Sequence, residues 1–219
     1  MNSTSILVVE GKSDEAFYTE LCSSLAIKAS IKVAPPKALG GRANNKEGVF
    51  SLLPSMLNQL ADGSLARLAL VVDADFASEH GLGFVRTYER VTNIVSHFGF
   101  SPIRRPNING LLFQNSDGLH DIGLWIMPNN RDEGMLEHWI KASIVPGETQ
   151  LMQDVEKIID KLAAPKFKAL HQIKAEVATW LALQEFPGRG MESAVKEKLL
   201  DETSLPFLQL VSWIKHIYS

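Results

Sequence analysis

The chain has 219 residues, enough for one large domain or for one domain with a sizeable appendage. A hydrophobic fraction of 45% and a charged fraction of 21% are ordinary for a globular protein, whereas the net charge of −3 argues against a surface coated in basic residues for duplex DNA. Cys22 is the single cysteine, which excludes a disulfide framework and a zinc knuckle and favours a cytoplasmic protein; we expect neither a signal peptide nor a membrane span.

The first predicted elements form a strand-helix unit with a carboxylate at the strand tip. Residues 6–9 are aliphatic and end at Glu10, a pattern typical of a buried strand. Residues 14–25 then repeat apolar side chains at helical spacing, with Ser13 or Asp14 as the expected N-cap. Glu10 is therefore expected at the carboxyl end of the first strand.

The second unit ends in two carboxylates. A short strand over residues 31–34 and an amphipathic helix over 49–60 lead to the apolar run 68–72, which reads as a strand buried on both faces of a parallel sheet. Asp73 and Asp75 follow at the carboxyl end, where open α/β sheets bind ligands. Crowded carboxylates repel each other unless a cation neutralises them, so the pair suggests Mg²⁺. The alternative is that one aspartate caps the next helix and the other is solvated.

The rest of the chain adds a helix, two strands and a helical region. A helix is expected over 85–98, followed by strands over 111–113 and 122–127 that are joined by residues typical of a hairpin turn. Four periodic segments then predict helices, at 151–162, 166–184, 191–200 and 207–218. We therefore expect an α/β fold, with a Rossmann-like, mostly parallel sheet flanked by helices over residues 1–145 and a helical C-terminal region, 146–219, packed on it.

Two motifs resemble the Toprim superfamily, the metal-binding domain shared by type IA topoisomerases, bacterial primases and overcoming-lysogenization-defect-like nucleases. The resemblance spans about residues 5–140 and implies that Glu10 acts as general acid or base while Asp73 and Asp75 hold Mg²⁺ or Mn²⁺. Asp14 matches a further acidic position of the nuclease-like branch, where it adds a ligand; a helix N-cap is the alternative role. The motifs are Val8-Val9-Glu10-Gly11-x-x-Asp14-x-x-Phe17 and Val71-Val72-Asp73-Ala74-Asp75.

A second resemblance covers nearly the whole chain. The sequence is similar to a bacterial family of small Toprim-related proteins of unknown function, so this likeness names a family without an activity. Its segments are Met127-Pro128-Asn129-Asn130-x-x-x-Gly134-Met135-Leu136-Glu137 and Trp180-Leu181-Ala182-x-Gln184-Glu185-x-Pro187-Gly188. Glu133 and Glu137 are four residues apart, on one face if helical, and are candidates for completing a two-metal site. For Glu133 a favourable charge near a helix N-terminus is the alternative.

Basic residues in predicted loops are candidates for phosphate contacts, although each is equally well explained as a solvated surface charge. They are Lys12, Arg42, Lys46 and Arg131, together with Lys37, Arg104 and Arg105. A P-loop is disfavoured, because the motif that ends in Gly11-Lys12-Ser13 would need a glycine where the chain has Ile6. His138 and the tryptophans are expected to pack in the core or face solvent, and no tyrosine is placed as a covalent nucleophile.

The leading hypothesis is a Mg²⁺-dependent, nuclease-like enzyme that cleaves phosphodiesters. Glu10 would be the general base, Asp73 and Asp75 metal ligands, and Glu137 a ligand of a second metal. The alternative is a catalytically weak Toprim scaffold that binds a protein or nucleic acid in a defence or repair complex, or pairs with a second copy through its C-terminal helices. A phosphohydrolase acting on small nucleotides is a third hypothesis.

Overall fold

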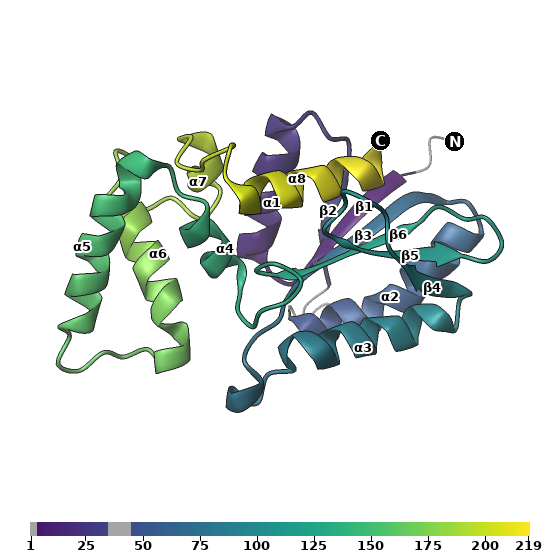
Figure 1. Cartoon of the computed structure of the whole chain (residues 1–219), viewed down its shortest axis with the longest axis horizontal. Helices are drawn as coiled ribbons and strands as arrows, with labels where there is room; N and C mark the ends of the chain where they lie inside the picture. The colour runs from purple at the N-terminus through teal and green to yellow at the C-terminus, as the bar shows by residue number, and fades with distance from the viewer. Residues whose placement is uncertain (1–3, 35–44) are drawn as a thin grey trace.

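A six-stranded sheet organises the computed structural model, which describes residues 4–34 and 45–219. The strand order is β2-β1-β3-β6-β5-β4, in which β2, β1, β3 and β6 run parallel and β5 and β4 extend the sheet through antiparallel pairings (Figure 1). The predicted α/β fold with a mostly parallel sheet is thus confirmed. The strands are β1 Thr4–Val9, β2 Ser30–Val33, β3 Leu65–Asp73, β4 Phe100–Ile103, β5 Leu111–Asn115 and β6 Ile122–Met127.

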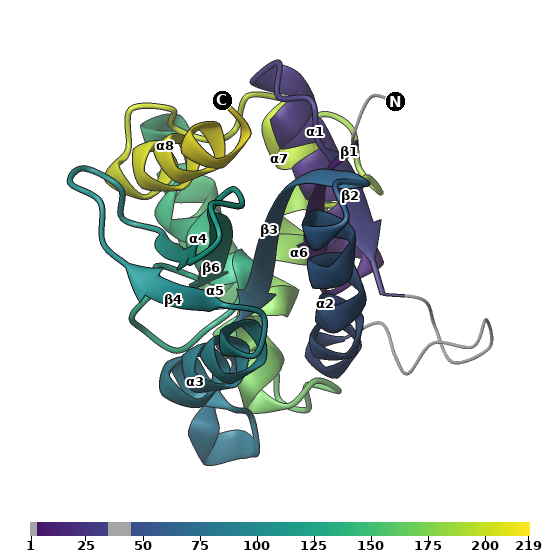
Figure 2. The ribbon, with the colours of Figure 1, turned by 90° about the vertical axis from the view of Figure 1, so that its right-hand side faces the viewer.

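Helices cover both faces of this sheet. Helices α2 and α3 lie on one face, and α1 and α8 lie on the other (Figures 1 and 2). In the described part of the chain, no helix is both long and apolar enough to cross a membrane. The helices are α1 Lys12–Ser24, α2 Lys46–Ala61, α3 Gly83–Ser96, α4 Leu136–Ala142, α5 Thr149–Asp160, α6 Gln172–Ala182, α7 Ser193–Lys196 and α8 Leu205–Tyr218.

Alternate residues of the central strands supply two separate cores. In β1, Leu7 and Val9 pack with α1 and with the C-terminal helices, whereas Ile6 and Val8 pack with α2 and α3. Successive side chains of a strand point to opposite faces, so a strand covered on both sides must be apolar throughout. This is why the strands that carry the candidate acids are uninterrupted aliphatic runs in the sequence.

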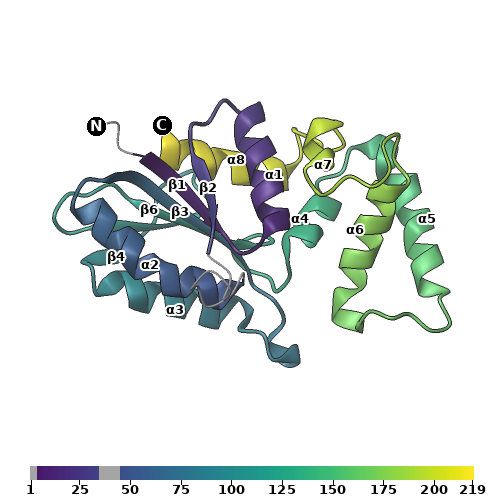
Figure 3. The same ribbon diagram turned by 180° about the vertical axis from the view of Figure 1, so that it is seen from behind.

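The helical C-terminal region packs on the sheet, as predicted, and α8 is its main contact. The Tyr218 hydroxyl donates a hydrogen bond to the Ile6 carbonyl (2.7 Å), and Trp213 lies against Trp125 of β6 with ring centroids 5.5 Å apart. Helices α5 and α6 lie side by side beyond α4, at the end of the molecule away from β4 (Figure 3). The chain therefore returns to the first strand at its C-terminus.

Several element boundaries differ from the sequence prediction. Strand β4 was not predicted, because it contains Pro102 and proline disfavours a strand. Proline has no N–H group to donate to a neighbouring strand, but β4 lies at the edge of the sheet, where that loss is tolerated. Helix α2 begins at Lys46 rather than Val49, because Asn45 caps it by accepting the Gly48 N–H (3.1 Å). The helix expected over 166–184 begins only at Gln172, and the one over 191–200 is reduced to α7.

Candidate metal centre

Two carboxylates meet where adjacent parallel strands end. Glu10 follows β1 and Asp73 is the last residue of β3, so both lie at the carboxyl edge of the sheet. Glu10 Oε1 accepts the Asp73 backbone N–H (2.8 Å), and Asp73 Oδ1 accepts the N–H of Leu136, the first residue of α4 (3.0 Å). Backbone donors therefore fix these two carboxylates against each other and against α4.

Two helices add a carboxylate each. Asp14 lies in the first turn of α1, and its Oδ2 accepts the Gly11 N–H (2.8 Å); Gly11 is the N-cap, so the prediction of a cap at Ser13 or Asp14 was wrong. Glu137 lies in the first turn of α4 and is only 6% exposed. Its Oε1 accepts a hydrogen bond from Lys174 of α6 (2.7 Å), a partner that the sequence analysis missed.

These four side chains, Glu10, Asp14, Asp73 and Glu137, are called the acidic cluster below. Each has one oxygen held by a backbone N–H or by Lys174, while the other oxygen has no hydrogen-bond partner among the described residues. Glu137 Oε2 is fully buried in this state. A buried carboxylate oxygen without a donor is costly, so this oxygen needs a proton or a cation.

Burial and mutual repulsion raise the pKa values of Glu10, Asp14 and Asp73. Loss of solvation raises the pKa of Glu10 to about 7, against the opposing charge of Lys46. Loss of solvation also raises the pKa of Asp14 to about 6, with a smaller contribution from Glu137. For Asp73, burial and then the neighbouring carboxylates raise the pKa well above its usual range. At neutral pH the cluster therefore retains protons unless a cation replaces them.

Asp75 lies beside the cluster and is paired with a lysine. It has a left-handed backbone (φ 59°), and its N–H donates to the Gly134 carbonyl (2.9 Å). Its Oδ2 binds Lys46 Nζ at 2.6 Å, and the same ammonium donates to the Ala74 carbonyl at 3.1 Å. Lys46 is 6% exposed, so it is a buried counter-ion rather than a loop residue. Asp73 and Asp75 therefore have different partners, although only one residue separates them in the sequence.

The other candidate residues lie outside this cluster. Glu133 does not share a helical face with Glu137, because Gly134 (φ 147°) and an extended Met135 precede α4; Glu133 Oε1 instead accepts the Ala77 N–H at 3.2 Å. Among the basic candidates, Lys12 pairs with Glu15 (2.5 Å) and Arg131 with Asp132 (3.0 Å), both at the surface. Arg42 lies outside the described residues.

The chemistry of the acidic cluster fits a hard divalent cation, but its side chains are closed in this structure. Four carboxylates and a buried unpartnered oxygen are a donor set that Mg²⁺ or Mn²⁺ accepts. Within residues 4–34 and 45–219, however, no three acidic, histidine or cysteine side chains converge enough to enclose an ion. The hollow beside Glu10, Asp14 and Asp73 is too small for a water molecule. Ion binding would therefore require these side chains to rotate.

The fold and the cluster define an α/β protein with acids from two strand ends and two helix starts at one edge of a mostly parallel sheet. The chain belongs to the family described as "Protein of unknown function (DUF3226)", whose model matches residues 4–219. This agrees with the expectation of one family of unknown function over nearly the whole chain. No curated protein and no solved structure matches the chain significantly.

Proposed function

We propose that this protein is a Toprim-type, nuclease-like enzyme that cleaves phosphodiesters with Mg²⁺ or Mn²⁺ bound at the acidic cluster. The observation that carries the proposal is the concentration of four carboxylates, one buried and three partly buried, at the carboxyl edge, each with one oxygen left unpartnered within the described chain. Structural acid clusters are normally neutralised by cationic side chains. Within residues 4–34 and 45–219, Lys46 and Lys174 are the cations that pair with these acids, of which there are five when Asp75 is included.

The proposed roles follow from what holds each side chain. The N–H of Leu136 fixes one oxygen of Asp73, which supports Asp73 as the first ligand of the proposed ion, with Asp14 and Glu137 as further ligands. Glu10, whose pKa is about 7, is suited to take a proton from the attacking water at neutral pH. The bound ion would supply Lewis-acid activation of the phosphoryl group and of that water. Asp75 stays a candidate ligand through its second oxygen.

A basic pocket at the same edge supports a polyanionic substrate. A pocket of about 570 Å³ lies where β6 ends, one strand beyond β3, and Arg104, Arg105 and Arg131 line it. Arg105 pairs with Asp121 and Arg131 with Asp132, whereas Arg104 has no acidic partner in the described chain. The buried Trp125 Nε1, in the same wall, has no acceptor there. Guanidinium groups and a free indole N–H are suited to phosphate oxygens.

The ion pairs in the site favour a second candidate function. Lys46 on Asp75 and Lys174 on Glu137 neutralise part of the negative charge, as in a scaffold that has little activity of its own. In that case the chain would bind a protein or nucleic acid, or a second copy through its C-terminal helices. The third hypothesis, hydrolysis of small nucleotides, differs from nuclease action in the chain length of the preferred substrate.

The test combines metal binding with cleavage. Wild-type protein is titrated with MgCl₂ and MnCl₂ by calorimetry and is then assayed on single- and double-stranded DNA, on RNA and on mononucleotides. We expect metal-dependent cleavage that Asp73→Asn abolishes and that Asp154→Asn, an exposed aspartate of α5, leaves unchanged. A wild-type protein that binds neither ion would remove the basis of the enzyme hypothesis and leave the scaffold.

A further inference from the structure

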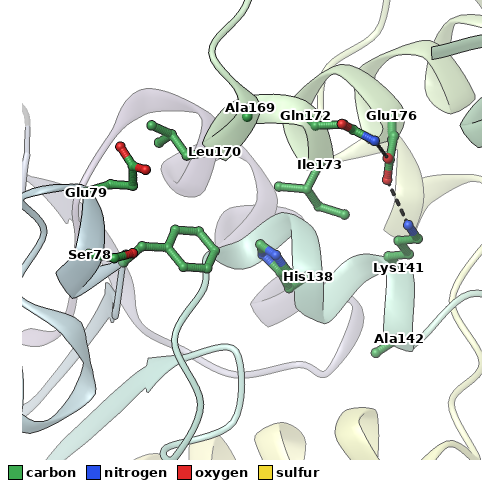
Figure 4. Close-up of a pocket in the computed structure, with 11 residues that line it drawn as sticks. Ser78, Glu79, His138, Lys141, Ala142, Ala169, Leu170, Gln172, Ile173 and Glu176 are labelled. Atoms are coloured by element: carbon green, nitrogen blue, oxygen red, sulfur yellow. Dashed lines mark hydrogen bonds and ion pairs between the residues drawn. The ribbon is translucent and has the colours of Figure 1, made fainter. Parts of the chain in front are cut away.

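A second pocket lies next to the acidic cluster. It has a volume of about 670 Å³ and opens between the segment after β3, helix α4 and the start of α6 (Figure 4). Pockets of this size hold small organic ligands. Three residues that line the pocket are adjacent in the sequence to residues of the candidate metal centre. Phe76 follows Asp75, His138 follows Glu137, and Ile173 precedes Lys174.

The walls of this pocket are largely apolar. Leu170 and Ile173 lie across the space from Ser78 and His138 (Figure 4). The rings of Phe76 and His138 meet edge to face, with centroids 5.8 Å apart. Aromatic and aliphatic side chains of this kind favour a ligand with a ring that can pack against them.

Few polar groups in the pocket are free to bind a ligand. His138 accepts the Met135 N–H at Nδ1 (3.2 Å), so in the neutral ring Nε2 carries the proton and can donate. Gln172 donates its amide to carboxylates on both sides, which leaves its carbonyl oxygen as an acceptor. Lys141 forms ion pairs with Glu176 (2.7 Å) and Glu156 (2.6 Å), so its positive charge is already neutralised.

The charge in the pocket disfavours an anion and favours a neutral ligand that brings hydrogen-bond donors. The carboxylate of Glu79 has no partner in the described chain, whereas both oxygens of Glu176 already accept hydrogen bonds and Lys141 is neutralised. Acceptors therefore outnumber free donors, and a ligand with two N–H hydrogens on one nitrogen satisfies more of them than a ligand with one. A single ring acceptor would take the His138 Nε2–H.

We infer that this pocket binds a nucleobase that carries an exocyclic amino group, with adenine as the best-matched case, while the attached phosphate lies at the acidic cluster. The inference rests on the proposed function, since it supplies the base of the same substrate. In this arrangement helices α4 and α6 bind the base, and the carboxyl edge of the sheet cleaves the phosphodiester. One substrate would therefore contact both the sheet and the helical C-terminal region.

The test measures base binding without metal or turnover. Wild-type protein in EDTA is titrated with adenosine and with inosine, which differs by replacement of the amino group, and chemical shifts of backbone amides are followed by NMR. We expect adenosine to bind at least about tenfold more tightly than inosine, because an unmatched buried polar group costs on the order of a tenfold change or more. If the trinucleotide ApApA binds more tightly than adenosine, the pocket takes a base of a nucleic-acid strand. If the two bind equally, the pocket takes the base of a free nucleotide.

A filled pocket provides the control. Ala169→Trp places an indole in the pocket from an exposed position, whereas Ala164→Trp adds the same side chain outside it. Adenosine binding should be lost only in the first variant, with both variants folded by circular dichroism. Equal affinity for the two nucleosides, or adenosine binding that survives Ala169→Trp, overturns the inference even if Mg²⁺-dependent cleavage is found. Selective adenosine binding without any cleavage would support this pocket and reject the nuclease.

Discussion

Replacing Asp73 by asparagine should stabilise the metal-free protein while abolishing its response to Mg²⁺. The amide oxygen of asparagine can still accept the Leu136 N–H that Asp73 Oδ1 accepts at 3.0 Å. The substitution therefore replaces a partly buried ionisable carboxyl group by a neutral amide without removing the contact that positions the side chain. The neighbouring carboxylates of Glu10, Asp14 and Glu137, which raise the pKa of Asp73, are relieved of repulsion in return.

The size of this effect can be worked from the electrostatics of the cluster. Two like charges about 5 Å apart repel by roughly 3 kcal/mol at an effective dielectric constant of about 20. Part of that repulsion is already relieved by bound protons, since burial and then the neighbouring carboxylates raise the pKa of Asp73 well above its usual range. A net gain of about 2 kcal/mol near pH 8 corresponds to a rise of roughly 4–8 °C in melting temperature for a chain of this length. Near pH 5, where most of these groups are protonated, the gain should vanish.

The assay is thermal unfolding followed by circular dichroism, in EDTA and in excess MgCl₂, at both pH values. In EDTA near pH 8 the variant should melt above wild type; in MgCl₂ wild type should gain stability and the variant should not, because ligand binding stabilises the folded state by mass action. Asp154→Asn, which changes an exposed aspartate, should follow wild type throughout. A variant that melts below wild type in EDTA near pH 8 would refute the view that the cluster stores repulsion.

Three further predictions concern the same elements. Without metal, the free energy of unfolding of wild type by urea should fall as pH rises from about 4.5 to about 7, because the folded state, in which the pKa of Glu10 is raised, binds more protons than the unfolded state in that range. Lys174→Met leaves Glu137 buried without its cation and should cost about 1 kcal/mol, a discounted value because the lysine is 43% exposed. Gly110→Ala should prevent stable folding, since its Cβ would lie 1.8 Å from Trp213 Cδ1.

Each of these has a matched control. A pH profile measured in saturating MgCl₂ should be flatter, because the ion displaces the protons; equal slopes would contradict the charge argument. Lys161→Met removes an exposed lysine at the end of α5 and should leave the urea midpoint unchanged. Gly147→Ala introduces the same methyl group where nothing lies within 4 Å, so soluble expression of both glycine variants at equal melting temperature would contradict the packing argument.

The sheet and its acidic edge were predictable because their causes are local. An aliphatic run such as 68–72 ends where a carboxylate appears, and parallel strands bring such ends together. Helix starts were less predictable, because capping depends on single side chains. Asn45 caps α2, which therefore begins before the first apolar residue of its repeating pattern. The apolar pattern over residues 191–200 predicted a longer helix than α7, which spans only Ser193–Lys196. Local patterns therefore predicted the buried central strands more firmly than the edge strand β4 or the starts of the helices.

The Asp73 and Asp75 pair shows why the site itself was only partly predictable. A spacing of two places side chains on one face only while the strand continues. Strand β3 ends at Asp73, and the left-handed backbone of Asp75, held by Gly134, turns its carboxylate to Lys46. Lys174 carries no local signal at all, because its partner is a glutamate in another helix. Such contacts depend on tertiary packing, which one sequence does not encode locally.

The way the chain holds its acids argues that the excess negative charge is functional. Backbone N–H groups of Gly11, Asp73 and Leu136 each fix one oxygen of a carboxylate; those of Gly11 and Leu136 lie at helix starts, whereas that of Asp73 ties Glu10 to the neighbouring strand. Fixing the acids in this way keeps them close despite their repulsion; burial, with smaller contributions from Asp75 and Asp14, raises the pKa of Glu10. A purely structural site would lower that repulsion with further lysines or replace an acid by an apolar residue. A site that exchanges protons for a divalent ion needs the repulsion to persist until the ion arrives.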